Sequence, residues 1–257
     1  MCLIVLARQV HPDYPLIVLA HRDEFTARPS QPLTWWPDAA TLAGRDLAAG
    51  GTWLGAHRNG RFAAVTNVRE GPAQASARSR GELVPNWLHN PALDPEQHRE
   101  QLAAARQYSG FNLLFGDWHR GRLQLHYSSN RFPGREVAPG IWALSNGDFD
   151  APWPKARRAK AVLADLLGQG GIPAPFWLDA LADDQIAADH ELPDTGIGLD
   201  KERWLSPMRI TGPHYGTRAA TLLSLRADGK LQLHERSLAP ELGGQITAEH
   251  SFSLMLA

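Results

Sequence analysis

The chain has 257 residues, of which 43% are hydrophobic and 21% are charged, values close to those of an average globular protein. Its 26 basic and 27 acidic side chains leave a formal charge of −1, which argues against a nucleic-acid partner. The first twenty residues hold two short apolar runs, too short for a transmembrane segment and without the basic start of a secretory signal. We therefore expect one domain over residues 1–257, located in the cytoplasm.

Alternating apolar segments and turn-forming residues predict many short strands, with a few helices between groups of them. The predicted strands are residues 2–8, 15–22, 51–57, 61–69, 111–117, 122–129, 141–146, 217–226, 230–236 and 247–256. The predicted helices are residues 83–88, 95–108, 154–167 and 175–181. Antiparallel strands in such numbers predict an α+β fold in which two packed sheets are covered by helices.

Cys2 is the only cysteine of the chain, which excludes an internal disulfide and a multi-cysteine zinc site. A small residue at position 2 favours removal of Met1, and this would leave a free α-amine beside the thiol. That amine has a reference pKa of about 7.7 to 8.0, so it can take a proton from the thiol and return it to a leaving group. The alternative is that Cys2 packs as a small core residue ahead of the apolar run that follows it.

The first predicted hairpin turns near residue 12, which places Cys2 opposite Arg22 and Asp23. Arg22 can lower the pKa of the thiol and hold a substrate carboxylate or carbonyl, and Asp23 can anchor the α-ammonium group. The alternative is that the charged run from Arg22 to Glu24 is a solvated strand end with surface ion pairs.

The second predicted hairpin turns at Asn59-Gly60, a dipeptide typical of a type I′ turn, and this register places Thr52 opposite Asn67. Gly50-Gly51 leaves the backbone open to close approach by a ligand. Asn67 can donate a hydrogen bond to an oxyanion, or it can cap the end of its strand.

Several motifs, taken in order, resemble the NRDE family, also called the transport-and-Golgi-organisation protein 2 family. The family's asparagine is replaced by His21 here, and the similarity covers nearly the whole chain. The motifs are Met1-Cys2-Leu3-Ile4, Ala20-His21-Arg22-Asp23-Glu24-Phe25, Arg28-Pro29, Gly44-Arg45-Asp46, Gly50-Gly51-Thr52-Trp53-Leu54-Gly55, Thr66-Asn67-Val68-Arg69, Ser79-Arg80-Gly81, Tyr108-Ser109-Gly110-Phe111-Asn112-Leu113, Ser129-Asn130, Leu144-Ser145-Asn146, Pro152-Trp153-Pro154-Lys155 and Tyr215-Gly216-Thr217-Arg218.

The resemblance implies the four-layer αββα sandwich of N-terminal-nucleophile hydrolases of the penicillin V acylase and bile-salt hydrolase type. By that likeness Cys2 is nucleophile and base, with Arg22 and Asp23 as its supports. Asn67 and Asn146 become oxyanion or amine-binding groups, and Arg218 becomes a cation near the thiol. The structural alternatives are that Asn146 forms the hydrogen bonds of its own turn and that Arg218 forms a salt bridge at the start of a strand.

Two functions follow from these observations. The first is hydrolysis of a linear, non-peptide amide by Cys2, which requires no cofactor and no metal. The second is a binding protein that uses the same pocket for haem, in haem trafficking, or for acyl-coenzyme A or another lipid. Family members have been connected with both ligands, and Cys2 or a histidine would then ligate the haem iron. The remaining candidates for lining the pocket are His21, Glu24, Arg45, Thr52, Trp53 and Arg69.

Overall fold

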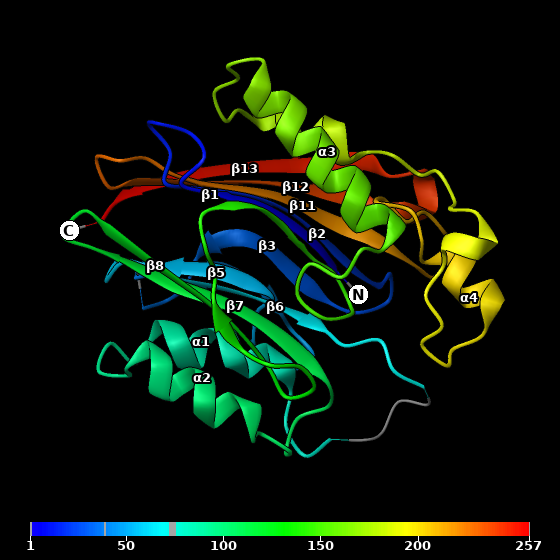
Figure 1. Ribbon diagram of the computed structural model, residues 1–257, viewed down its shortest axis with the longest axis horizontal. Helices are drawn as coiled ribbons and strands as arrows, with labels where there is room; N and C mark the ends of the chain where they lie inside the picture. The colour runs from blue at the N-terminus through cyan, green and yellow to red at the C-terminus, as the bar shows by residue number, and fades with distance from the viewer. Residues whose placement is uncertain (1, 39, 72–75, 257) are drawn as a thin grey trace.

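Two antiparallel sheets face each other across the centre of the molecule, and helices cover their outer faces (Figure 1). The computed structural model describes residues 2–38, 40–71 and 76–256. Between the sheets lies an apolar core to which both contribute, with Leu6, Leu16, Leu125 and Leu231 fully buried in it. Because one face of each sheet is buried against the other and the second face against helices, the predicted αββα sandwich is confirmed.

The six-stranded sheet has the order β10-β1-β2-β11-β12-β13, and all neighbouring strands are antiparallel. The first hairpin pairs Cys2 with Arg22 and Leu3 with His21, which is the predicted register. The strands are β1 (Cys2–Arg8), β2 (Leu16–Phe25), β10 (Gly140–Leu144), β11 (Tyr215–Leu225), β12 (Lys230–Ala239) and β13 (Gln245–Met255). Cys2 therefore lies at the end of a strand in the interior of this sheet.

The seven-stranded sheet follows the order of the chain, from β3 to β9. Two of its strands, β3 and β4, fall in a region for which the sequence predicted none. The strands are β3 (Ser30–Trp35), β4 (Thr41–Asp46), β5 (Leu54–His57), β6 (Arg61–Asn67), β7 (Phe111–His119), β8 (Arg122–Ser129) and β9 (Arg135–Glu136). The end of β6 lies close to the end of β1, because the two sheets pack face to face with these strands in contact.

The second hairpin is shifted by one residue from its predicted register. Leu54 pairs with Ala64, so Thr52 does not lie opposite Asn67 and β5 begins only after it. In this hairpin Gly60 has a positive φ of 96° and Asn59 does not, whereas a type I′ turn requires positive φ at both residues. The loop is therefore one residue longer than a two-residue turn, and the pairing shifts with it.

Helices cover both sheets on the outside (Figure 1). The pair α1 (Leu83–Leu88) and α2 (Pro95–Ala103) packs on the seven-stranded sheet, with Trp87 fully buried. The longer α3 (Pro154–Gly168) packs on the six-stranded sheet. The other helical segments are α4 (Leu199–Trp204) and the 3₁₀ helices η1 (Arg80–Glu82), η2 (Pro175–Leu181), η3 (Asp189–Glu191) and η4 (Pro240–Leu242). In the part of the chain that the structure describes, none of the helices has the length and apolar character needed to cross a bilayer.

Candidate active site

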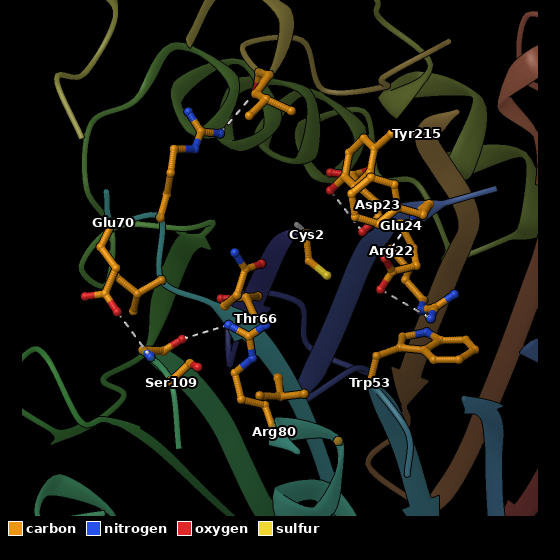
Figure 2. A pocket seen from close by; sticks show the side chains of 18 of the residues that line it. Cys2, Arg22, Asp23, Glu24, Trp53, Thr66, Glu70, Arg80, Ser109 and Tyr215 are labelled. Carbon is orange, nitrogen blue, oxygen red and sulfur yellow. Dashed lines mark hydrogen bonds and ion pairs between the residues drawn. The ribbon is translucent and has the colours of Figure 1, made fainter. Parts of the chain in front are cut away.

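A cavity of about 860 Å³ opens where the ends of β1, β2 and β6 meet (Figure 2). Both sheets line it, and residues 196–205 with α4 form a further wall. Cys2 contributes to its lining, and Figure 2 shows the thiol with Arg22 and Asp23 on one side and Arg80 on the other. The cavity thus brings together residues that are far apart in the sequence around one sulfur atom.

Cys2 is half-buried at the start of β1. Its backbone is held on two sides, by pairing with Arg22 on β2 and by the Ser145 hydroxyl, which donates to the Cys2 carbonyl at 3.1 Å. Burial raises the pKa of the thiol, and the charge of the N-terminal ammonium group, the backbone N–H of Asp23 and the charge of Arg22 lower it only in part. Arg22 therefore acts in the predicted direction but does not produce a thiolate near neutral pH, so the nucleophile would need a base.

Alkylation of Cys2 is expected to follow this raised pKa. The rate with iodoacetamide should be low at pH 7 and still be rising about tenfold per pH unit at pH 9, because only the thiolate reacts. Mass spectrometry of the modified N-terminal peptide at several pH values measures this rate. A rate already at its plateau at pH 7 would contradict the expected direction.

Arg22 is buried, with 5% of its surface exposed, and lies in the wall of the cavity. Its guanidinium stacks on the ring of Trp53 at 4.3 Å, and its Nη2 lies 3.7 Å from Glu24 Oε2 (Figure 2). Both partners also line the cavity, as do Thr52 and Arg69. The run from Arg22 to Glu24 is therefore part of the cavity rather than a solvated strand end.

Asp23 is 2% exposed and holds its position through β11. The Thr217 hydroxyl donates to Asp23 Oδ1 at 2.7 Å, and the Tyr215 hydroxyl donates to the Asp23 carbonyl at 3.1 Å. These bonds fix a carboxylate beside the end of β1, where the α-amine of Cys2 would lie after removal of Met1.

Asn67 ends β6 and lines the cavity, whereas Asn146 is fully buried behind it. Asn146 Nδ2 donates to the Asn67 carbonyl at 2.9 Å and to Asn67 Oδ1 at 3.2 Å. Because Oδ1 is held by Asn146, the Nδ2 group of Asn67 is left as a donor, as an oxyanion site requires. Asn146 thus acts on the cavity through Asn67, not by lining it.

His21 does not line the cavity, because it precedes Arg22 on β2 and its side chain points to the opposite face of the sheet. It is 2% exposed, and its Nδ1 lies 2.9 Å from the carbonyl oxygen of Met208. Burial lowers its pKa, so the imidazole is neutral at pH 7. Its environment is that of a hydrogen-bonded core residue.

Arg45 also lies outside the cavity, at the end of β4. Its guanidinium stacks on Trp36 at 4.8 Å, and its Nε donates to the Gly50 carbonyl at 3.4 Å. Gly51 is approached closely, but by protein backbone, since a Cβ there would lie 2.2 Å from the Gly81 carbonyl oxygen. The predicted close approach of a ligand at this point is therefore wrong.

Arg218 is the extra residue of a bulge in β11, between Thr217 and Ala219, and it does not line the cavity. Its Nη1 donates to the carbonyl oxygens of Phe25, at 3.1 Å, and Arg28. These bonds hold the turn that follows β2, so the side chain acts on the backbone around the site.

Two basic residues near the thiol carry no predicted role, although both occur in the motifs quoted above. Arg80 lines the cavity, and Lys155 is 1% exposed at the start of α3. Within the described part of the chain, no hydrogen-bond partner is present for Lys155 Nζ. The sequence does contain a signal that Lys155 is unusual. It shares a helix face with the buried Ala159 and Leu163, and a cation in the first turn of a helix opposes the helix dipole.

Replacing Lys155 with methionine is expected to stabilise the protein at pH 7. Burial lowers the pKa of Lys155 from 10.5 to about 8. Below pH 8 the side chain is therefore charged in both states, and this charge destabilises the folded state because it is removed from water there. The free energy of unfolding should rise by about 1 to 3 kcal/mol, and this gain should shrink as pH rises from 8 to 10.5. Urea unfolding at pH 7 and pH 10 measures it, with exposed Lys201→Met as the control. A loss of stability in Lys155→Met at pH 7 would overturn the expectation.

Within the described residues, no cluster of three or more His, Cys, Asp or Glu side chains is arranged to hold a metal ion. Of the residue types that ligate haem iron, the described residues that line the cavity include Cys2 and Tyr215 and no histidine. The arrangement around Cys2 therefore supplies a thiol, a buried carboxylate and an oriented amide donor, which are the groups of acyl transfer.

Comparisons with known proteins agree with the motifs. The family described as Transport and Golgi organisation 2 matches residues 1–240. The human Transport and Golgi organization protein 2 homolog is 30% identical over 274 residues, covering 99% of each chain. The cattle (Bos taurus) homolog is 31% identical over 93% of each chain, and Transport and Golgi organization protein 2 of Drosophila melanogaster is 23% identical, covering 93% of this chain and 92% of its own.

Among solved structures, the Caenorhabditis elegans ortholog of N-acylethanolamine-hydrolyzing acid amidase superposes with a TM-score of 0.47 at 8% identity, covering 86% of this chain and 92% of its own. The family assignment rests on the sequence matches, which span almost the whole chain and confirm the resemblance seen in its motifs. The chain belongs to the Transport and Golgi organisation 2 family.

Proposed function

We propose that this protein is a cysteine amidohydrolase that cleaves a linear, non-peptide C–N bond. The observation that carries the proposal is the setting of Cys2, at the end of β1 and in the lining of an 860 Å³ cavity with Arg22, Asp23 and Asn67 around it. A lone cysteine packed in a core would have no need of a buried carboxylate and an oriented amide beside it.

In the proposed reaction, Met1 is first removed, and the α-amine of Cys2 takes the proton of its own thiol. The sulfur then bonds to the amide carbonyl carbon, and the carbonyl electrons move to the oxygen, which accepts hydrogen bonds from Asn67 Nδ2 and a backbone N–H. Collapse breaks the C–N bond, and the α-ammonium gives its proton to the leaving amine. Water then cleaves the thioester, releasing the acid and restoring the thiol.

The raised pKa of the Cys2 thiol supports a mechanism that needs this base. With the thiol protonated at neutral pH, a proton acceptor has to act during the attack, and the α-amine has a reference pKa in the right range. Asp23 holds the amine in place, and Arg22, stacked on Trp53, balances the charge of the thiolate that forms.

Intact-mass measurement tests the proposal. The purified chain should lack Met1, and incubation with a panel of N-acyl amides should give a transient adduct with the mass of the acyl group on the N-terminal peptide, with a burst of released amine. Retention of Met1, or turnover without any adduct, would refute the amine-assisted mechanism.

Binding of haem or of acyl-coenzyme A in the same cavity stays a prediction, as does a cytoplasmic location. A cavity with arginine side chains and an apolar wall has the chemistry to hold either ligand. A haem titration of the wild type and of Cys2→Ala separates the two functions. A saturable Soret shift that depends on Cys2, with no amide turnover, would favour the binding protein.

A further inference from the structure

The arginines that line the cavity differ in whether a carboxylate neutralises them. Three are paired: Arg22 with Glu24 at 3.7 Å, Arg28 with Asp46 at 2.8 Å, and Arg69 with Glu202. Within residues 2–38, 40–71 and 76–256, no carboxylate oxygen lies within 4.0 Å of the Arg80 guanidinium. Arg80 is half-buried in the cavity, so its charge is both shielded from bulk water and available to a ligand.

The backbone around Arg80 is fixed by close contacts. The Gly81 carbonyl accepts a hydrogen bond from Thr52 N–H at 3.0 Å and packs against Gly51, and the Ser79 hydroxyl accepts one from Gly81 N–H at 3.2 Å. One guanidinium nitrogen, Nη1, donates to the Gly110 carbonyl at 3.1 Å. The side chain is thereby oriented while its Nη2 and Nε remain to bind a planar anion through two parallel bonds.

Figure 2 shows Arg80 entering the cavity on the side of Cys2 opposite Arg22. Burial lowers the pKa of Arg80, and the negative charges of Cys2, Glu24 and Glu70 oppose this shift. The guanidinium remains a cation at neutral pH because the pKa of arginine starts above 12. An anion on Arg80 would therefore lie close to the bond that Cys2 attacks.

Three aromatic rings meet on the other side of the cavity, near Asp23 and Glu24 (Figure 2). Tyr215 makes edge-to-face contacts with Phe25 at 5.1 Å and with Trp204 at 5.3 Å between ring centroids. Phe25 is 59% exposed and Trp204 is 42% exposed, although both line the cavity, and Ile197 lies beside them. Exposed aromatic rings at a cavity mouth are typical of a surface that an apolar ligand covers.

We propose that the cavity takes an N-acyl amino acid, whose carboxylate pairs with Arg80 and whose apolar acyl chain lies along Phe25, Tyr215 and Trp204. The cleavage rests on the amidohydrolase function proposed above and consumes one water, giving a free carboxylic acid and a free amino acid. The volume of about 860 Å³ suits a ligand of this size.

A matched pair of ligands tests the assignment: N-dodecanoylglycine and its neutral counterpart N-dodecanoylglycinamide. Wild-type protein should prefer the acid, and Arg80→Gln should lower the ratio of kcat/KM for acid over amide about 10- to 100-fold. The ratio is the readout because an effect of Arg80 on the reactivity of the thiol would change kcat/KM for acid and amide alike and leave their ratio unchanged. Arg80→Lys keeps the charge but loses the two parallel bonds, so it should retain only part of the preference. Arg106→Gln removes an exposed cation that lies outside the cavity and should change the ratio less than about threefold.

Binding of the same pair to Cys2→Ala, measured by calorimetry, separates this inference from the hydrolase proposal. Tighter binding of the acid that is lost in an Arg80→Gln, Cys2→Ala double variant supports the anion site even if wild type shows no turnover. Equal binding or equal turnover of acid and amide in a folded wild type overturns it, as does a preference that survives Arg80→Gln. Thermal melting confirms that each variant is folded.

Discussion

Replacing Cys2 with alanine is expected to lower kcat/KM for N-dodecanoylglycine by at least about 1000-fold, because the alanine side chain removes the nucleophile and leaves only binding and the oxyanion donors. Stability should change little, since Cys2 is half-buried at a strand end and the backbone bonds that hold it are kept. Release of glycine under single-turnover conditions measures the loss.

A control separates the thiol from the α-amine. Insertion of one alanine between Met1 and Cys2 keeps the sulfur on β1 but moves the free amine by one residue. We expect ligand binding and alkylation of Cys2 to persist in this variant and turnover to fall about as far as in Cys2→Ala. If the insertion variant kept more than about a tenth of wild-type turnover, the α-amine would not be the base.

Breaking the buried pair between Arg69 and Glu202 is expected to cost about 3 to 5 kcal/mol of stability. Both side chains are 3% exposed, and Glu202 also accepts from the Thr195 backbone and hydroxyl, at 3.1 Å and 2.5 Å. Glu202→Gln keeps the shape but leaves a buried guanidinium without its counter-charge. Because Arg69 follows β6 and Glu202 belongs to α4, the variant should also loosen the wall that carries Trp204. Urea unfolding measures the first effect and ligand affinity the second.

An exposed pair provides the comparison. Arg203 Nη2 and Asp189 Oδ2 lie 2.7 Å apart with 40% and 56% of the side chains exposed, so Asp189→Asn should cost far less stability than Glu202→Gln. The double variant Arg69→Met, Glu202→Leu should be more stable than Glu202→Gln, since neither charge is then buried. A Glu202→Gln effect as small as that of Asp189→Asn would contradict a desolvated pair.

The register around the nucleophile could be predicted because the first hairpin joins two continuous apolar runs across a turn rich in proline. The position of that turn, near residue 12, sets the pairing and places Cys2 opposite Arg22. The second hairpin was more ambiguous, because Asn59-Gly60 fits a two-residue or a three-residue loop. The choice depends on the φ of Asn59, which local sequence does not determine.

The missed features depend on tertiary contacts. Strand β3 contains Pro32, which argues against a strand in a sheet interior, but β3 is an edge strand with irregular register at that point. Arg80 follows a segment without strand or helix signals, and tertiary contacts, such as the packing of Gly51 on Gly81, bring it to the thiol. That no carboxylate of the described residues pairs with it is a property of the assembled cavity, which no motif expresses.

Because of the bulge at Arg218, the cavity depends on the number of residues in β11 as well as on their chemistry. Side chains alternate between the two faces of a strand. One additional residue in β11 therefore turns the side chains that precede it to the opposite face of the sheet. Tyr215 and Thr217 reach Asp23 and the aromatic wall only with that additional residue in place. A chain one residue shorter here could keep every side chain named in the site and still present the wrong face to its ligand.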